Sequence, residues 1–174
     1  DRDVDGNGVI TTDDRIIYSQ RPDVTFGFNN TFNYKGFDLS VFLYARLGQW
    51  IAYDYNTTYR INALENGGNV DYWTPENPTN AFPRPNKSKS YTQVTYYSTL
   101  KYEDGSFFKI RDITLGYTFK PELLKHLNLS RLRVYATAKN FFTFSKIDNY
   151  DPEQGGSISF PMTKQLVFGL NVEF

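Results

Sequence analysis

The sequence contains no cysteine and only one histidine among its 174 residues, and its 19 basic side chains balance 19 acidic ones. Without cysteine, the chain can form neither a disulfide nor a reactive thiolate. We expect a surface or packing role for His126, which stands beside Leu127 in a short turn, and no Ser-His-Asp triad is expected around it. Zero net charge argues against a nucleic-acid partner. These features predict that the chain is not an enzyme.

The sequence also lacks any run of about 18 apolar residues, so no membrane-spanning helix is expected. A mean hydropathy of −0.54 would by itself suggest a soluble protein. That inference does not hold for outer-membrane β-barrels, because their apolar residues alternate with polar ones and the mean hydropathy stays low. The chain begins without Met or a recognisable signal peptide, so we expect it to be an internal or C-terminal piece of a longer protein.

Alternating residues predict β-strands. The stretch FGFNNTFNY places Phe26, Phe28, Phe32 and Tyr34 on one face and small polar residues on the other. This period of two is typical of a strand, and the 15 Phe and 14 Tyr residues favour strands as well. The same reasoning predicts strands at residues 23–34, 37–47, 107–119, 131–144 and 162–174.

The connections between these strands alternate in length. Lys35 and Gly36 predict a two-residue hairpin turn, and Pro121 predicts one or two helical turns within residues 120–130. Residues 48–106 and 145–161 are long connections that are rich in turn residues and expected to be irregular. The apolar alternation changes phase before Asp112, which indicates either a β-bulge there or an extension of the strand beyond the membrane.

Strand length, loop alternation and aromatic residues at the strand ends together favour a membrane barrel over a soluble β-sandwich. Strands of roughly 11–13 residues can cross a bilayer when tilted, whereas soluble strands average about five or six. Short periplasmic turns, long extracellular loops and two aromatic girdles are typical of outer-membrane barrels. Asn30 and Asn140 depart from the pattern on the apolar face, and we expect them in bends or against other protein.

The fold class is therefore all-β, an antiparallel transmembrane β-barrel segment with long extracellular loops. Five strands cannot close a barrel, because single-chain bacterial barrels begin at about eight. An open edge would leave backbone groups unpaired in lipid. We therefore expect the remaining strands to be supplied by another part of the protein.

The first residues, DRDVDGNGVITTDD, have the spacing of a calcium loop. Such a loop presents about six oxygen ligands, at positions 1, 3, 5, 7, 9 and 12, with glycine at position 6. Counted from Asp3, the glycine is Gly8, and Ile10 would hold the loop to the structure beneath it. The predicted calcium ligands are Asp3, Asp5, Asn7, the carbonyl of Val9, Thr11 through water, and Asp14.

Two alternatives to this calcium site remain open. Counting from Asp1 also gives alternate acids, but Thr12 would then be a poor final ligand, so we prefer the register that starts at Asp3. A metal-free turn rich in Asp and Asn would explain the acids without an ion.

The order of motifs resembles the C-terminal end of SusC/RagA-type TonB-dependent outer-membrane transporters of Bacteroidetes. The matching stretches are the acidic loop at residues 3–14, PDVTFGFNNTFNYKGFDLSVFL, DYWTPENPTNAFPRP, FFKIRDITLGYTF, LRVYATAKNFFTF, YDPE and a closing strand that ends in Phe174. The resemblance covers essentially the whole chain.

This resemblance implies a barrel of about 22 strands around a plug that would lie upstream of this chain. It implies TonB-driven import of oligosaccharides or peptides across the outer membrane of a Gram-negative bacterium, with a SusD-like lipoprotein capping the barrel. TonB would act through the missing N-terminal part. Residues 1–22 would form an extracellular loop, and residues 23–174 would form the C-terminal strands and loops, with the C-terminus in the periplasm.

Substrate contact is harder to predict. Tyr72 and Trp73 could stack on a sugar, but they could equally pin the long loop or contact the lipoprotein. A further set of residues would face the lumen, where they would pack against the plug or line a wet wall: Asp38, Tyr44, Arg46, Arg133, Tyr135 and Lys139. The competing functions are a structural or adhesive barrel that transports nothing and a calcium-dependent interaction module.

Overall fold

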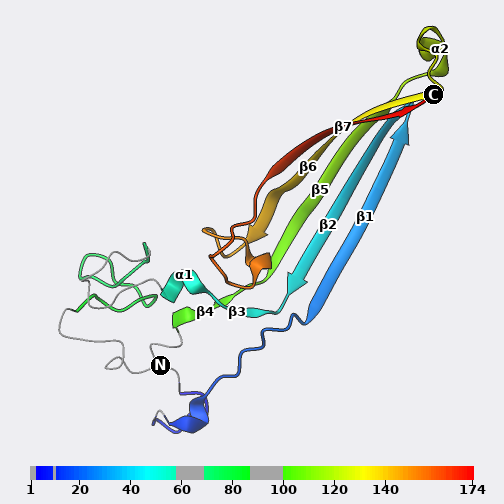
Figure 1. Cartoon of the computed structure of the whole chain (residues 1–174). Coiled ribbons are helices and arrows are strands. Elements are labelled where there is room, and N and C mark those ends of the chain that lie inside the picture. Colours follow the sequence, from blue (N-terminus) through cyan, green and yellow to red (C-terminus); the bar gives the residue numbers. More distant parts are fainter. Residues whose placement is uncertain (1–2, 10, 58–68, 87–99) are drawn as a thin grey trace.

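The computed structural model describes residues 3–9, 11–57, 69–86 and 100–174. Its main feature is a five-stranded antiparallel sheet in the order β1-β2-β5-β6-β7. The strands are β1 (Val24–Tyr34), β2 (Phe37–Leu47), β5 (Phe107–Thr118), β6 (Arg131–Ser145) and β7 (Gln165–Glu173). They form one long, curved layer, and none of the described helices covers either face (Figure 1). All five predicted strands are confirmed, with ends that differ by at most three residues.

The two faces of this sheet differ in chemistry, as the alternation predicts. On one face, Phe28 lies opposite Leu43 and Leu115 lies opposite Ala136. This face is open: Phe168 is 75% exposed. Soluble proteins cover an apolar surface of this size, whereas lipid covers it in a barrel wall. The opposite face is polar, and we call it the polar face.

The turns at one end of the sheet confirm the sequence analysis. Lys35 and Gly36 have φ values of 45° and 90°, which the preferred two-residue hairpin turn requires. Between β5 and β6 lie two short helices, α2 (Pro121–Leu124) and η4 (Lys125–Leu127), anchored by the buried side chain of Leu124. Figure 1 places both turns together with the C-terminus at this end.

The predicted bulge is also confirmed. The ladder between β2 and β5 pairs Leu43 with Ile110 and then Phe42 with Asp112, so Arg111 is the extra residue. On the neighbouring strand, Asn140 has a φ of 59°. Its side-chain amide donates a hydrogen bond to the carbonyl of residue 163 at 3.2 Å, so this Asn lies in an irregular part of β6.

Asn30, the other expected departure, lies opposite Val41 within a regular part of β1. It is half-buried, and the ladder shows no register shift at this position. Asn30 therefore does not lie in a bend, and its contact with other protein stays a prediction.

The connection from residue 48 to residue 106 contains more regular structure than the sequence suggests. Strand β3 (Trp50–Ala52) pairs with β4 (Tyr102–Asp104) in a separate two-stranded sheet, and α1 (Asp54–Thr57) follows β3. Three-residue strands are too short to show alternation, which is why the sequence pattern missed them.

Two further short helices, η1 (Thr12–Asp14) and η5 (Pro152–Gln154), lie in the N-terminal segment and in the β6–β7 connection. A small core joins the long connections, with Ile51, Tyr53 and Ile147 buried together. Within the described ranges, no helix has the length and apolar character needed to cross a membrane.

Candidate functional site

The N-terminal loop folds around the carboxylates of Asp3 and Asp14. Asp3 accepts backbone hydrogen bonds from Gly6 at 2.6 Å and from Gly8 at 2.7 Å. Asp14 accepts a backbone hydrogen bond from Thr11 at 2.7 Å, and together these two residues form a capping box for η1. Gly8 has a φ of 81°, a conformation that glycine adopts readily and that permits the sharp turn at the sixth loop position.

Three carboxylates converge in this loop. Oxygens of Asp3, Asp5 and Asp14 all lie within 4.8 Å of one another. The backbone hydrogen bonds from Gly8 and Thr11 hold the pKa values of Asp3 and Asp14, respectively, below the usual 3.8, so both groups are ionised at neutral pH. Like charges at this separation repel unless a cation lies between them, and carboxylate oxygens are the donors that calcium prefers. The residues therefore fit a calcium ion.

The other three predicted ligands lie in the same loop. The side-chain carbonyl of Asn7 accepts a hydrogen bond from the amide of Val9 at 2.8 Å, and the hydroxyl of Thr11 accepts one from Asp13 at 3.2 Å. Their coordination of an ion stays a prediction. Asp1 and Ile10 lie outside the described residues, so the alternative register and the anchoring role of Ile10 also stay predictions.

Asp71 orders the loop that carries Tyr72 and Trp73. Its carboxylate accepts hydrogen bonds from Thr79 and Asn77, each at 2.7 Å, and these bonds hold the pKa of Asp71 below its usual value. Tyr72 and Trp73 are 42% and 39% exposed. Both rings are accessible on an ordered loop, and their contact with a substrate stays a prediction.

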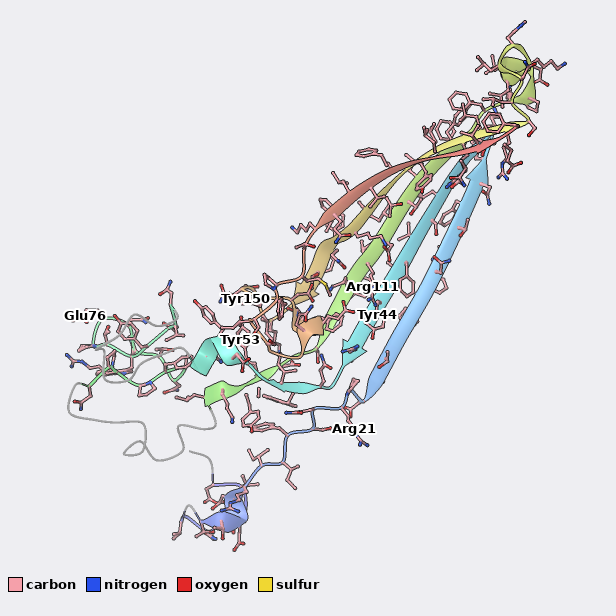
Figure 2. All side chains as sticks on the ribbon, in the orientation of Figure 1. Arg21, Tyr44, Tyr53, Glu76, Arg111 and Tyr150 are labelled. Carbon is pink, nitrogen blue, oxygen red and sulfur yellow. The ribbon has the colours of Figure 1, made fainter. Side chains whose placement is uncertain are left out.

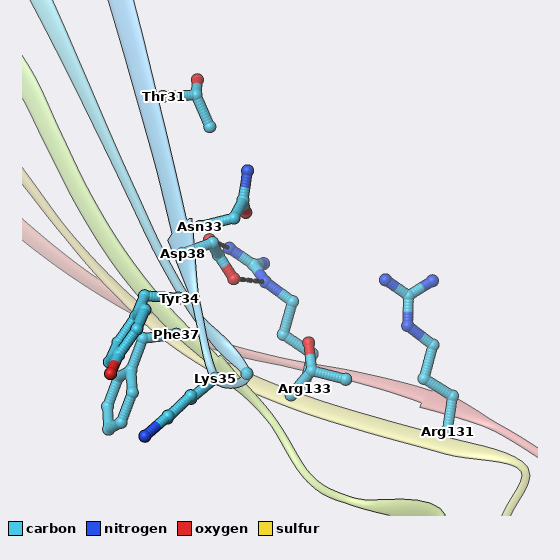
Figure 3. A pocket seen from close by; sticks show the side chains of 10 residues that line it. Thr31, Asn33, Tyr34, Lys35, Phe37, Asp38, Arg131 and Arg133 are labelled. Carbon is cyan, nitrogen blue, oxygen red and sulfur yellow. Dashed lines mark hydrogen bonds and ion pairs between the residues drawn. The ribbon is translucent and has the colours of Figure 1, made fainter.

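An ion pair braces the polar face near the β1–β2 turn. Arg133 of β6 crosses β5 and donates two hydrogen bonds to Asp38 of β2, at 2.8 and 2.5 Å. Gly116 makes the crossing possible, since a Cβ atom there would lie 2.5 Å from Asp38 Oδ1. Figure 3 shows this pair beside a hollow that Lys35 and Arg131 also line. The predicted placement of Asp38 and Arg133 on one face is confirmed.

Tyr135 and Lys139 lie on the same polar face. The ring of Tyr135 covers Gly169 of the neighbouring strand, where an added Cβ would clash with it. Lys139 pairs with Asp112 at 3.5 Å. Gly116 and Gly169 therefore both leave room for a large side chain of a neighbouring strand to lie across them.

A buried charge network that the sequence analysis missed fastens the β6–β7 connection to the sheet. Lys109 of β5 is fully buried, and its ammonium group lies 2.6 Å from Asp151 and 2.8 Å from Glu153. Arg111 lies 3.2 Å from the second carboxylate oxygen of Glu153. The sequence did contain a signal for this pairing. The strand motif FFKIRD carries basic residues, and the loop motif YDPE carries acidic ones.

Next to this network, two guanidinium groups lie close to the ring of Tyr44. Arg46 and Arg111 have their Cζ atoms 5.5 and 5.2 Å from the ring centroid. Arg46 also donates a hydrogen bond through Nε to the Tyr44 hydroxyl at 2.8 Å. Figure 2 shows Tyr44 and Arg111 close together on the ribbon at the loop-bearing half of the sheet.

Known proteins are similar to this chain in both sequence and fold. The chain is 31% identical over 195 residues to TonB-dependent receptor P3 of Formosa agariphila, covering 99% of this chain and 18% of that protein. It is also 31% identical over 181 residues to TonB-dependent receptor SusC of Bacteroides thetaiotaomicron, covering 99% of this chain and 17% of SusC. The RagAB peptide importer in its closed-closed state matches with a TM-score of 0.75 at 28% identity, over 99% of this chain and 20% of that one.

The chain is related to the SusC/RagA-type TonB-dependent receptors. It spans about a fifth of the length of these relatives. No protein-family model matches it. The SusC/RagA relatives are receptors and importers and not enzymes, which confirms the expectation of a non-enzyme. Receptors of this type are outer-membrane barrels, so the relationship supports an outer-membrane location and a barrel-segment fold.

Proposed function

We propose that this chain forms part of the barrel wall of a TonB-dependent outer-membrane transporter that imports oligosaccharides or peptides. The match to the RagAB peptide importer over 99% of the chain carries the proposal. The sheet supports it physically, because its apolar face is exposed along the whole wall and its opposite face carries charged and hydroxyl groups.

The proposal includes the partners that such a transporter needs. A SusD-like surface lipoprotein would cap the barrel, TonB would act through a part of the protein outside this chain, and the plug and the other strands would complete the barrel. Residues 1–22 would form an extracellular loop, and residues 23–174 would form C-terminal strands and loops with the last strand ending in the periplasm. The common position of the long loops at one end of the sheet supports this orientation (Figure 1).

In this proposal, calcium has a structural role. Bound to Asp3, Asp5 and Asp14, it would neutralise the converging carboxylates and hold the loop in shape just before β1. Extracellular calcium is plentiful enough to keep a site of modest affinity filled. Tyr72 and Trp73 would contact the substrate or the lipoprotein from the long connection between β2 and β5.

The proposal is tested by deleting the full-length gene and measuring growth on defined oligosaccharides or peptides as the limiting nutrient. We expect growth on one nutrient class to fail, and to be restored by the intact gene but not by a version whose TonB-binding segment is removed. Unchanged growth and uptake on every nutrient, together with lost attachment to surfaces, would support an adhesive barrel instead.

A further inference from the structure

The polar face carries more positive than negative charge around Tyr44. Three cations gather there, Lys109, Arg111 and Arg46, whereas the carboxylates that reach them are those of Asp151 and Glu153. Asp112, the nearest acid on β5, is already paired with the lysine at position 139. Counted over the described residues, the cluster therefore has one cation in excess.

The excess charge lies on Arg46. Among the described residues, no carboxylate oxygen lies within 4.0 Å of the Arg46 guanidinium group. The ammonium group of Lys109 and the guanidinium group of Arg111 each have a carboxylate partner. Asp23 immediately precedes the neighbouring strand β1, but its carboxylate lies against Gly48. Arg46 is half-buried, so its charge is partly desolvated and interacts strongly with an anion that reaches it.

The surrounding aromatic residues fix Arg46 in position. Its Cζ atom lies 5.5 Å from the Tyr44 ring and 6.0 Å from the ring of Phe107, which is only 2% exposed. Its Nε donates to the Tyr44 hydroxyl, and no hydrogen bond from its two terminal nitrogens to another described residue is present. The edge formed by these two nitrogens presents two parallel N–H groups, the geometry that binds a carboxylate through both oxygens.

The bulge adds a second guanidinium, that of Arg111, near the same ring. Because Arg111 is the extra residue of the bulge, its side chain joins that of Lys109 on the polar face. The Arg111 side chain is 39% exposed, so it is both anchored by Glu153 and accessible. Tyr44 thus lies within 5.5 Å of two cations and adds aromatic surface to the same cluster.

We propose that Arg46, supported by Tyr44 and Arg111, binds a carboxylate of the transported molecule, so that the transporter prefers acidic oligosaccharides or acidic peptides. The inference rests on the proposed transport function and names the substrate class. A uronic acid or a peptide carboxylate would supply the same two oxygens. The charge count among the described residues favours an anion, because none of their carboxylates pairs with Arg46.

The test uses purified full-length transporter in detergent and two matched probe pairs. One pair is tetragalacturonate and its methyl ester, and the other is a pentapeptide library with free or amidated C-termini. Each pair is mixed at equal concentration, and the retained ligand is quantified by mass spectrometry. We expect the free acid of one pair to be enriched by about tenfold or more, the range that one charge-assisted bidentate contact provides. The pair that shows enrichment identifies the source of the carboxylate.

Arg46→Gln should abolish the enrichment. Arg131→Gln is the matched control, because Arg131 lies on the same polar face at the other end of the sheet and has its own partner, Glu173. It should retain the enrichment. Heat-dependent migration on gels shows whether each variant still forms a folded barrel. Arg46→Lys keeps the positive charge and should retain part of the enrichment, so it provides a second variant for the test.

Two outcomes would overturn the inference: no enrichment of either free acid by the unmodified protein, or equal enrichment before and after Arg46→Gln. Neither would overturn the proposed transport function, which the growth experiment decides independently. Loss of growth in the deletion strain combined with no preference for acids would leave a transporter of neutral substrates.

Discussion

The ammonium nitrogen of Lys109 lies 2.6 Å from a carboxylate oxygen of Asp151, although 42 positions separate the two residues in the chain. The lysine belongs to the wall and the aspartate to the connection between β6 and β7. Asp151 also accepts the amide hydrogen of Glu153 at 3.0 Å, which shapes η5 so that both acids point toward the lysine. One buried cation therefore determines where this loop lies.

Replacing Lys109 with Met should release the loop. Removing one partner of a buried ion pair leaves the remaining charge without compensation and costs about 3–5 kcal/mol. We expect proteinase K to cut within residues 146–161 of the folded full-length barrel at least tenfold faster than in the unmodified protein, as followed by mass spectrometry.

Lys146→Met provides the control for that experiment. Lys146 also pairs with an acid, Asp104, but its side chain is 80% exposed, and exposed pairs contribute about 0–1 kcal/mol. Cleavage should remain at the unmodified rate. Equal rates in both variants would show that the buried pair does not hold the loop.

Gly116→Ala should destabilise the wall. The added methyl group would lie 2.5 Å from Asp38 Oδ1 and would force the Asp38–Arg133 pair apart, and overpacking of this kind costs about 1–3 kcal/mol. We expect a lower midpoint for guanidinium unfolding in detergent. Gly27→Ala, on the same polar face, meets only the ring of Phe42 at 3.6 Å and should leave the midpoint unchanged.

Calcium should bind the N-terminal loop with measurable heat. Calorimetry of the chelator-treated full-length barrel should show one site, and Asp14→Asn should weaken it on the order of tenfold or more, because fewer charged ligands lower calcium affinity. Asp13→Asn should bind normally, because Asp13 is not among the converging carboxylates. Absence of heat in the unmodified protein would leave a metal-free acidic turn.

The loop around Asp71 should depend on acid pH. Hydrogen bonds from Thr79 and Asn77 lower the pKa of Asp71 from its usual 3.8, so the stabilisation is fully present above that value and is lost as pH falls through the lowered pKa. We expect the Trp73 resonance of the full-length barrel labelled with 5-fluorotryptophan, assigned with Trp73→Phe, to shift below about pH 3.8. Asp71→Asn should remove the transition, and Glu76→Gln should preserve it.

The sequence predicts the wall well because alternation directly records which side of each strand meets lipid. The bulge could also be located, since Phe108 and Ile110 have the wrong parity for the alternation that begins at Ile113. Alternation shows that Asp38 and Arg133 share a face, but it does not say that Gly116 leaves them room to touch.

Contacts of the loops could not be predicted in the same way. The pairing of Lys109 with Asp151 depends on how a non-repetitive connection folds back, and no periodic pattern encodes that path. The three-residue strands β3 and β4 are likewise too short to be recognised. The acidic loop was found because its spacing follows ligand geometry and does not depend on contacts with the rest of the chain.

The short ladder between β3 and β4 has a consequence for how the protein can diversify. β3 begins three positions after the end of β2, and β4 ends three positions before the start of β5, so their pairing closes the long connection at its base. Doubling the length of a loop closed in this way costs only about 0.6 kcal/mol. Changes in length beyond the packed base of this connection, where Tyr53 is buried with Ile51 and Ile147, would therefore cost the wall little stability.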